Sequence, residues 1–448
     1  MKKKLYIILL FSMLVTACDD FIDKQPLDQL SQETFFTNEA TTQAALMGAY
    51  RSLTSSFAYG QALIVIPEFA AGHMRHISNF PEYMEYQNFN IRIDNPWALN
   101  IWTSSYQTIN AVNNIIGFAP QIDGFANNPA LQNLVLEARW IRALTYFNLV
   151  RAWGDVPLLL NPTTPATTST ATRVSRNSTQ EVYTAIVSDL EAAMNLPMIA
   201  GTGIMKGRAN GYSSRALLSK VHLYLENYTE SARLANEVIN SMEFTLVSNY
   251  SSIWQNENSQ ESIFELQFDE QTTNAFVQVA NPASRQEFFA SDLAYDLFEE
   301  NDLRRDFSIN EAVDNSGNIN LYVGKYRNFN PATQNIPIIR LAEIYLICAE
   351  ALARSQGTPL GEPQNHLGEV RTRAGLETTP TPALEAFIRA VQLEKRKELI
   401  FESEAYFDLI RTGLAFETLG LTNPQRALFP IPQLELDINN NLTQNPGY

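Results

Sequence analysis

Hydrophobic residues recur at three- and four-residue steps through much of the chain, which is the spacing that places them on one side of an α-helix. The clearest cases predict helices over 102–116 and 131–153, the second ending at a Gly-Asp-Val-Pro turn at 154–157. Ser178 or Thr179 is a candidate cap for the next helix. The same pattern predicts further helices from residue 38 and over 179–196, 212–226, 229–242, 338–354, 361–373 and 384–400.

Several of these predicted helices follow one another closely enough to form antiparallel pairs. Four such pairs can be drawn, rich in alanine and aromatic residues, and they predict a mainly α-helical superhelix of tetratricopeptide-like units. Two long stretches, 57–101 and 243–337, interrupt the pairs, and we expect them to be irregular insertions with a β-prone piece at 262–268. Loops of this length in a compact domain are usually functional.

The first seventeen residues have the organisation of an export signal. Three lysines at 2–4 precede an apolar run at 5–15 that is too short to span a bilayer. The run ends in Val-Thr-Ala-Cys, where a small residue precedes Cys18 as in a bacterial lipobox. We therefore expect Cys18 to be acylated and to anchor the protein to a membrane. The alternative is an ordinary signal peptide near which a cysteine happens to lie.

The net charge of the chain disfavours one class of partner, and the second cysteine has a structural explanation. The chain carries 32 Lys and Arg against 48 Asp and Glu, a formal net charge of −16. A surface this negative repels phosphate backbones, so nucleic-acid binding is disfavoured. The only other cysteine, Cys348, lies in a predicted helix and is expected to be a small core residue.

Seven short stretches, in the right order and spread over nearly the whole chain, resemble the SusD/RagB family of nutrient-binding lipoproteins. They are 18–26, 137–151 with 153–158, 207–209, 340–351, 371–375, 394–399 with 406–411, and 429–433 with 444–448. The chain departs from the family at 403–405, where the family often has a glycine and an arginine. It departs again at 71–73, where many members have an acidic residue.

The resemblance implies a fold and a role. It implies a signal peptide at 1–17, a lipid-anchored spacer at 18–37 and one domain at 38–448. In that domain a helical scaffold over about 38–56, 102–242 and 338–411 would support a binding half built from the two insertions. The protein would be non-catalytic and lipid-anchored, and it would sit at the surface of the outer membrane. There it would capture oligosaccharide for a SusC-like TonB-dependent transporter, or peptide as in the RagB-like branch.

Aromatic residues of the insertions are the candidates for ligand contact. Sugars present apolar C–H faces and hydroxyl rims, so their sites combine flat rings with fixed amides. We prefer Trp97 with Asn100, because tryptophan is costly to leave in an insertion unless it stacks on something. Further candidates are Tyr83, Tyr86, Trp254 and Tyr295. In contrast, we expect the core to hold Trp102, Tyr106, Trp140 and Trp153.

Catalysis and metal binding are the competing hypotheses. In the charged stretch 394–411, Glu398, Glu402 and Asp408 could act as acid and base of a glycosidase. We favour ion pairing within the scaffold, and we expect the arginines at 139, 142 and 151 to pair with acids between helices. His73 and His76 could ligate an ion or hydrogen-bond a sugar, but we favour a plain loop pair. We expect no cofactor and no metal.

Overall fold

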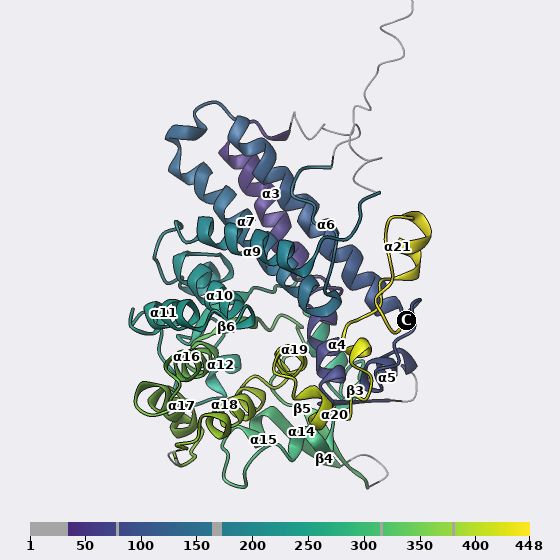
Figure 1. Cartoon of the computed structure of the whole chain (residues 1–448), viewed down its shortest axis with the longest axis vertical. Helices are drawn as coiled ribbons and strands as arrows, with labels where there is room; N and C mark the ends of the chain where they lie inside the picture. The colour runs from purple at the N-terminus through teal and green to yellow at the C-terminus, as the bar shows by residue number, and fades with distance from the viewer. Residues whose placement is uncertain (1–34, 78–79, 164–172, 314–316, 379–380) are drawn as a thin grey trace, which may run out of the picture.

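The long helices of the protein stack one against the next in chain order. The computed structural model describes residues 35–77, 80–163, 173–313, 317–378 and 381–448. Its long helices are α3 (Glu39–Leu53), α6 (Pro96–Phe118), α7 (Pro129–Trp153), α9 (Thr179–Ala193), α10 (Gly211–Tyr224), α11 (Tyr228–Ile239), α16 (Leu341–Gln356), α17 (Glu362–Arg373) and α18 (Leu384–Glu398). Helix α6 packs on α3 and α7, α7 on α9, α10 on α11, and α16 on α11, α17 and α18 (Figure 1). The prediction of a mainly α-helical fold is confirmed.

Local sequence signals start and end these helices. The Ser178 side chain accepts the N–H of Glu181, whose carboxylate reaches back to the Ser178 N–H, so the predicted cap of α9 is a full capping box. Helix α7 begins with a proline and ends at Gly154, which has a φ of +72°. A side chain there would also meet Leu428, since a Cβ atom would lie 2.9 Å from a Leu428 methyl group.

Shorter elements cover the lower and right-hand part of Figure 1. The short helices are α4 (Ala62–Ala70), α5 (Pro81–Gln87), α12 (Ser252–Gln255), α13 (Ala275–Ala280), α14 (Asp292–Tyr295), α15 (Arg305–Ser308), α19 (Ala405–Arg411), α20 (Ala415–Leu419) and α21 (Gln433–Ile438). Single 3-10 turns are η1 (Ala119–Gln121), η2 (Phe125–Asn127), η3 (Gly203–Gly207) and η4 (Pro424–Ala427).

Six strands form three antiparallel pairs in the described part of the chain. Strands β1 (Met74–His76) and β3 (Phe288–Ala290) pair with Arg75 opposite Phe289. Strands β2 (Ser262–Leu266) and β6 (Ile336–Arg340) pair with two register shifts, and β4 (Ile309–Val313) with β5 (Ile319–Val323) without any. The β-prone piece at 262–268 thus contains strand β2, which ends at Leu266.

The two insertions are less irregular than the sequence indicated. Residues 57–101 hold α4, β1 and α5 and also the first turn of α6, which begins at Pro96 rather than at 102. Helix α4 was missed because all of its residues except Glu68 are apolar, it contains Pro67, and eight of its nine residues are buried. It therefore lacks an alternation of apolar and polar faces that would reveal a helix. Trp97 and Asn100 therefore belong to a scaffold helix and not to a loop.

The apolar core draws on the scaffold and on both insertions. One cluster of buried side chains runs from Leu46 to Leu442. The predictions for Trp102, Trp140 and Trp153 are confirmed, since all three are buried. Cys348 is also buried, and burial raises the pKa of its thiol, so it is an inert core residue. No helix in the described ranges has the length and hydropathy needed to cross a bilayer.

Candidate functional site

The first turn of α6 is held in place by an asparagine cap. The side-chain oxygen of Asn95 accepts the N–H groups of Trp97 at 2.9 Å and of Ala98 at 3.3 Å. The Tyr86 hydroxyl donates to the same oxygen at 3.1 Å, and the Asn95 amide nitrogen donates to Glu85 at 2.7 Å. The hydrogen bonds of Asn95 therefore join the backbone at Trp97 to Tyr86 and Glu85 and hold it in place.

The Trp97 ring rests on a buried tyrosine. The Trp97 and Tyr83 rings are stacked, with centroids 5.3 Å apart and planes inclined by 20°. Tyr83 is stacked in turn on Phe69, and its hydroxyl donates to Glu287 at 2.6 Å. Burial, and then the Glu287 carboxylate, raise the pKa of the Tyr83 phenol far above its ordinary value. Trp97 itself is only half-buried, and its indole N–H has no bonding partner among the described residues.

Polar side chains continue from Trp97 along one side of α6. Asn100, Thr103 and Gln107 follow Trp97 at steps of three, three and four residues, so all four lie on neighbouring turns of one face. The amides of Asn100 and Gln107 have no hydrogen bond to any described residue, and both side chains are half-buried or exposed. We call these four residues the α6 face. It combines a fixed ring with amides that are free to bond a ligand.

Beyond Thr103, α6 forms one wall of a pocket of about 330 Å³, which we call the α21 pocket. Tyr106 lines it, half-buried, with its hydroxyl donating to the Pro157 carbonyl at 2.8 Å. The prediction of Tyr106 as a core residue was therefore wrong in part. The polar residues at 103, 107 and 110, spaced by four and three residues, were the sequence signal that this side of α6 is not core. The other lining residues are Trp102, Leu159, Thr163, Val174, Glu435, Ile438, Asn439 and Leu442.

Three of the ligand candidates proposed from the sequence are core residues. Tyr83 and Tyr86 are 0% exposed and Trp254 is 2% exposed, so none offers a ring face to a ligand. The reason is that the insertions fold into short helices packed on the scaffold, and their large rings fill that interface. Trp254, for example, lies against Tyr250 and beneath the Lys325 ammonium group, 4.5 Å from its ring centre. Instead, Tyr83 stacks against the Trp97 ring, and Tyr86 bonds the Asn95 side chain that caps the helix carrying it.

Tyr295 is half-buried at the end of α14 and lies under the Arg305 guanidinium, 5.1 Å from its ring centre. No ring of the other candidates contacts it within the described ranges. Trp97, Asn100 and Tyr295 thus remain candidates for ligand contact, and only the first two are brought together.

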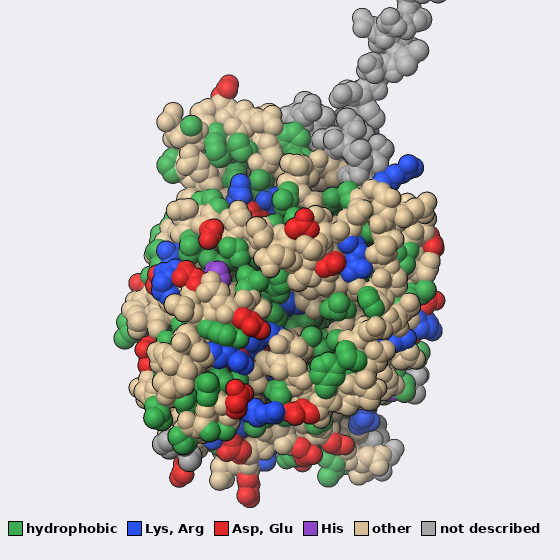
Figure 2. Space-filling model, viewed as in Figure 1, with side chains coloured by type: hydrophobic (Ala, Val, Ile, Leu, Met, Phe, Trp, Pro, Cys, Tyr) green, Lys and Arg blue, Asp and Glu red, His purple; other side chains and the backbone are tan. Residues whose placement is uncertain are grey.

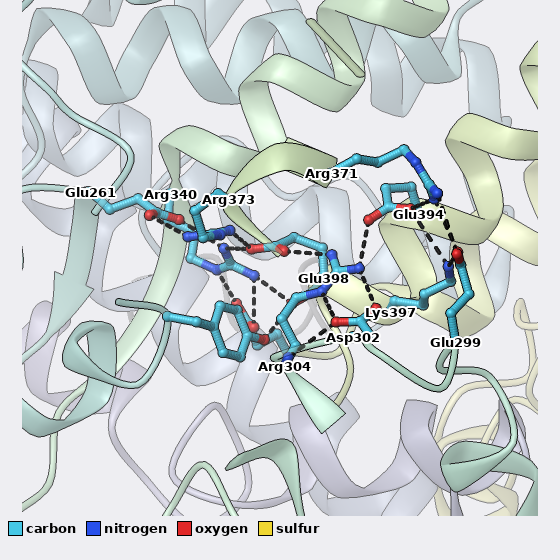
Figure 3. Close-up of polar contacts among 12 residues, drawn as sticks. Glu261, Glu299, Asp302, Arg304, Arg340, Arg371, Arg373, Glu394, Lys397 and Glu398 are labelled. Atoms are coloured by element: carbon cyan, nitrogen blue, oxygen red, sulfur yellow. Dashed lines mark hydrogen bonds and ion pairs between the residues drawn. The ribbon is translucent and has the colours of Figure 1, made fainter. Parts of the chain in front are cut away.

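Charged residues of the C-terminal scaffold and of the second insertion form a mostly buried network (Figure 3). Glu398 is 0% exposed and pairs with Arg304 at 2.9 Å, and also with Arg340 and Arg373. Glu261 accepts from both Arg340 and Arg373, at 2.9 Å each. We call this network the charge cluster. Its members are Glu261, Glu299, Asp302, Arg304, Arg340, Arg371, Arg373, Glu394, Lys397 and Glu398.

The electrostatics of these carboxylates favour a structural role. Burial opposes the ionisation of Glu398, but the guanidinium groups of Arg373, Arg340 and Arg304 outweigh it and hold the Glu398 pKa well below its usual range. Burial likewise opposes the ionisation of Asp408, and Arg411 and Lys395 lower its pKa. A general acid needs a raised pKa and access to substrate. The hypothesis that these residues form a glycosidase pair is therefore disfavoured.

The helix–helix arginines pair as predicted. Arg139 and Arg142 both bind Asp189, at 3.0 and 2.7 Å, and Arg151 binds Glu404 at 2.8 Å. These contacts tie α7 to α9 and to the residue that precedes α19.

The two histidines of the first insertion do not act together. His73 is buried, with its Nδ1 atom 2.7 Å from Glu68, and burial lowers its pKa despite that carboxylate. His76 lies on β1 opposite Phe288. No group of three or more possible metal ligands exists among the residues with a described position.

The face of the molecule seen in Figure 2 has no large patch of one charge. Lysine and arginine side chains are scattered among acidic ones and among hydrophobic groups. A basic surface of the kind that binds nucleic acid is not present on this face.

Two family models match the chain, one after the other. A model described as starch-binding, associating with outer membrane, covers residues 20–223, and a SusD family model covers residues 244–422. Among curated proteins, SusD-like protein P2 of Formosa agariphila is 26% identical, and the match covers 100% of both chains. SusD-like protein P25 of the same organism is 24% identical over 99% of this chain and 98% of its own length.

Solved structures have the same fold. A SusD superfamily protein from Parabacteroides distasonis superimposes with a TM-score of 0.80 at 24% identity, covering 92% of this chain and 100% of that one. A structure described as a laminarin-binding SusD-like protein superimposes with a TM-score of 0.79 at 26% identity, with the same coverage.

Proposed function

Because this chain belongs to the SusD/RagB family, as the two successive family models show, we propose that it is a surface protein that binds oligosaccharide without transforming it. The α6 face carries this proposal. Trp97 offers a fixed, half-buried ring, and Asn100 offers a free amide one turn away. A pyranose can lay its C–H face on such a ring while the amide bonds its hydroxyls.

The laminarin-binding relative supports a carbohydrate ligand, because it is similar to this chain over 92% of its length. The ion pairs of Glu398, Glu402 and Asp408 support binding without hydrolysis, since these carboxylates are already neutralised by cations. Tyr295 lies under Arg305 and is not part of the α6 face.

We further propose that the protein works at the outer membrane, as the description of the N-terminal family model indicates. Cys18, which lies outside the described residues, would carry the lipid anchor. The captured oligosaccharide would pass to a SusC-like TonB-dependent transporter. The long helices would provide the rigid surface on which that partner docks.

The test is calorimetric titration of the purified protein with laminarin oligosaccharides, other plant and algal glycans, and a peptide digest. We expect one glycan to bind and Trp97→Ala to weaken it by about tenfold to a hundredfold, since an anchoring aromatic carries much of a binding energy. Tyr228→Ala is the matched control, because Tyr228 is a half-buried ring on the distant helix α11 and should leave the affinity unchanged.

Each other result has a definite meaning. Binding of peptides alone would replace the oligosaccharide proposal by a RagB-like, peptide-binding role. Shortened glycan products after long incubation would overturn the non-catalytic proposal. Equal weakening by the Trp97 and Tyr228 variants would remove the α6 face as the site.

A further inference from the structure

The α21 pocket has the size and walls of a small-molecule site. Its volume of about 330 Å³ falls at the lower end of the range for ligand pockets. Trp102 and Tyr106 from α6 form one wall, and their rings are 5.1 Å apart. Leu159, Ile438 and Leu442 add aliphatic surface. The walls therefore suit an apolar body with a flat or compact shape.

The pocket is preformed, because α21 is fixed to the rest of the protein at both of its ends. The Gln433 N–H donates to the Ile93 carbonyl at 2.9 Å, and the Asn439 amide donates to the Val174 carbonyl at 2.9 Å. Just before α21, the Trp153 indole N–H donates to the Pro430 carbonyl at 2.8 Å. Binding of a ligand would therefore cost little conformational entropy, because the walls of the pocket are already ordered.

Glu435 is the only charged residue among the described residues that line the pocket. Its carboxylate forms no ion pair with any described cation, and burial raises its pKa. The Arg176 guanidinium lies close enough to act on the pKa of Tyr106 in the lowering direction. However, it donates its hydrogen bonds to the carbonyls of Asp155 and Thr443 and to the side-chain oxygen of Asn445. A partly desolvated carboxylate without a partner is unfavourable unless a cation pairs with it.

We propose that the α21 pocket binds a small organic cation, with the apolar body against Tyr106 and Trp102 and an ammonium group beside Glu435. Aromatic faces attract cations as well as apolar groups, so the rings and the carboxylate select for the same class of ligand. The pocket shares Thr103 and Gln107 with the α6 face, but Trp97 and Asn100 do not line it. It would take a different ligand class, and the proposal does not depend on oligosaccharide binding.

The proposal is tested with phenethylamine and with 2-phenylethanol, a neutral molecule of nearly the same shape, by calorimetry or ligand-observed NMR. We expect the amine to bind about tenfold more tightly than the alcohol, since a charge-assisted hydrogen bond distinguishes them. Glu435→Gln should remove this preference while leaving the weak binding of the alcohol unchanged.

Asp437→Asn is the matched control, because Asp437 is on the same short helix but exposed and not part of the pocket wall. It removes the same charge and should keep the preference for the amine. The proposal is overturned if amine and alcohol bind equally to the unaltered protein, if neither binds, or if Glu435→Gln and Asp437→Asn behave alike.

Discussion

The charge cluster and the α6 face use polar side chains in opposite ways. In the cluster, Glu398 and Arg340 are almost completely buried, and each bonds several partners of opposite charge. On the α6 face, Asn100 and Gln107 reach solvent and bond to no described residue. Buried charges survive only when paired, whereas a binding surface must leave its hydrogen-bonding capacity unused. In this protein a dense group of charged residues is therefore a poor guide to the binding site. Polar side chains without hydrogen-bond partners beside a fixed aromatic ring are a better guide.

The cluster also joins distant parts of the chain. Arg304 comes from the second insertion and pairs with Glu394 and Glu398 on α18, while Glu299 pairs with Lys397 at 2.7 Å. These contacts fasten the second insertion to the scaffold. The α6 face needs no such fastening, because its residues are neighbours on one helix.

The largest effect is expected when the charge of Glu398 is removed. Glu398→Gln keeps the shape of the side chain but leaves Arg304, Arg340 and Arg373 without their shared anion. Breaking a buried ion pair in this way costs about 3–5 kcal/mol, which a lower urea midpoint for unfolding would report. Glu230→Gln is the control: Glu230 pairs with Arg233 on the exposed side of α11, and its loss should cost no more than about 1 kcal/mol.

Glycan affinity measured on the same variants sharpens the comparison. If Glu398→Gln abolished ligand binding with no change in the urea midpoint, Glu398 would belong to a site and not to the scaffold.

A second, smaller effect is expected from acid. The folded-state pKa values of Glu398 and Asp408 lie below their unfolded values of about 4.5 and 3.8. A depressed carboxyl pKa contributes stability above the unfolded pKa, and that contribution is lost as the pH falls through the folded value. The urea midpoint should therefore be steady above about pH 5 and decline progressively below it. Asp408→Asn should lower the midpoint at neutral pH and flatten this decline. An equal decline in the variant would assign the acid sensitivity to other groups.

Strong periodicity allowed the long helices to be predicted closely. The prediction of 131–153 compares with Pro129–Trp153 for α7, and the small error arises because a proline begins the helix. Helix α4 was missed because it is apolar except at Glu68 and so shows no periodic pattern, and the start of α6 was missed because Trp97 was assigned to a loop.

The site was predicted only in part, because burial depends on contacts between distant segments. In the sequence, Tyr83 and Trp97 are both aromatic residues of the first insertion. Only the fold shows that Tyr83 is buried, with its hydroxyl bonded to Glu287, and that Trp97 lies above it. The α21 pocket forms where the C-terminal end of the chain folds back on α6. The polar residues at 103, 107 and 110 mark this side of the helix, but only the fold shows which segment covers it.

The smallest effect is expected at Asn100, and it tests the α6 face most directly. Asn100 has no hydrogen bond to lose within the described protein, so Asn100→Ala should leave the thermal unfolding midpoint unchanged. If its amide bonds a sugar hydroxyl, the same change should weaken glycan binding by up to about tenfold in calorimetry. Asn240→Ala, at an exposed asparagine that ends α11, should alter neither quantity. A fall in the unfolding midpoint without a fall in affinity would place Asn100 with the scaffold residues, and the contrast between the two regions would then rest on Trp97 alone.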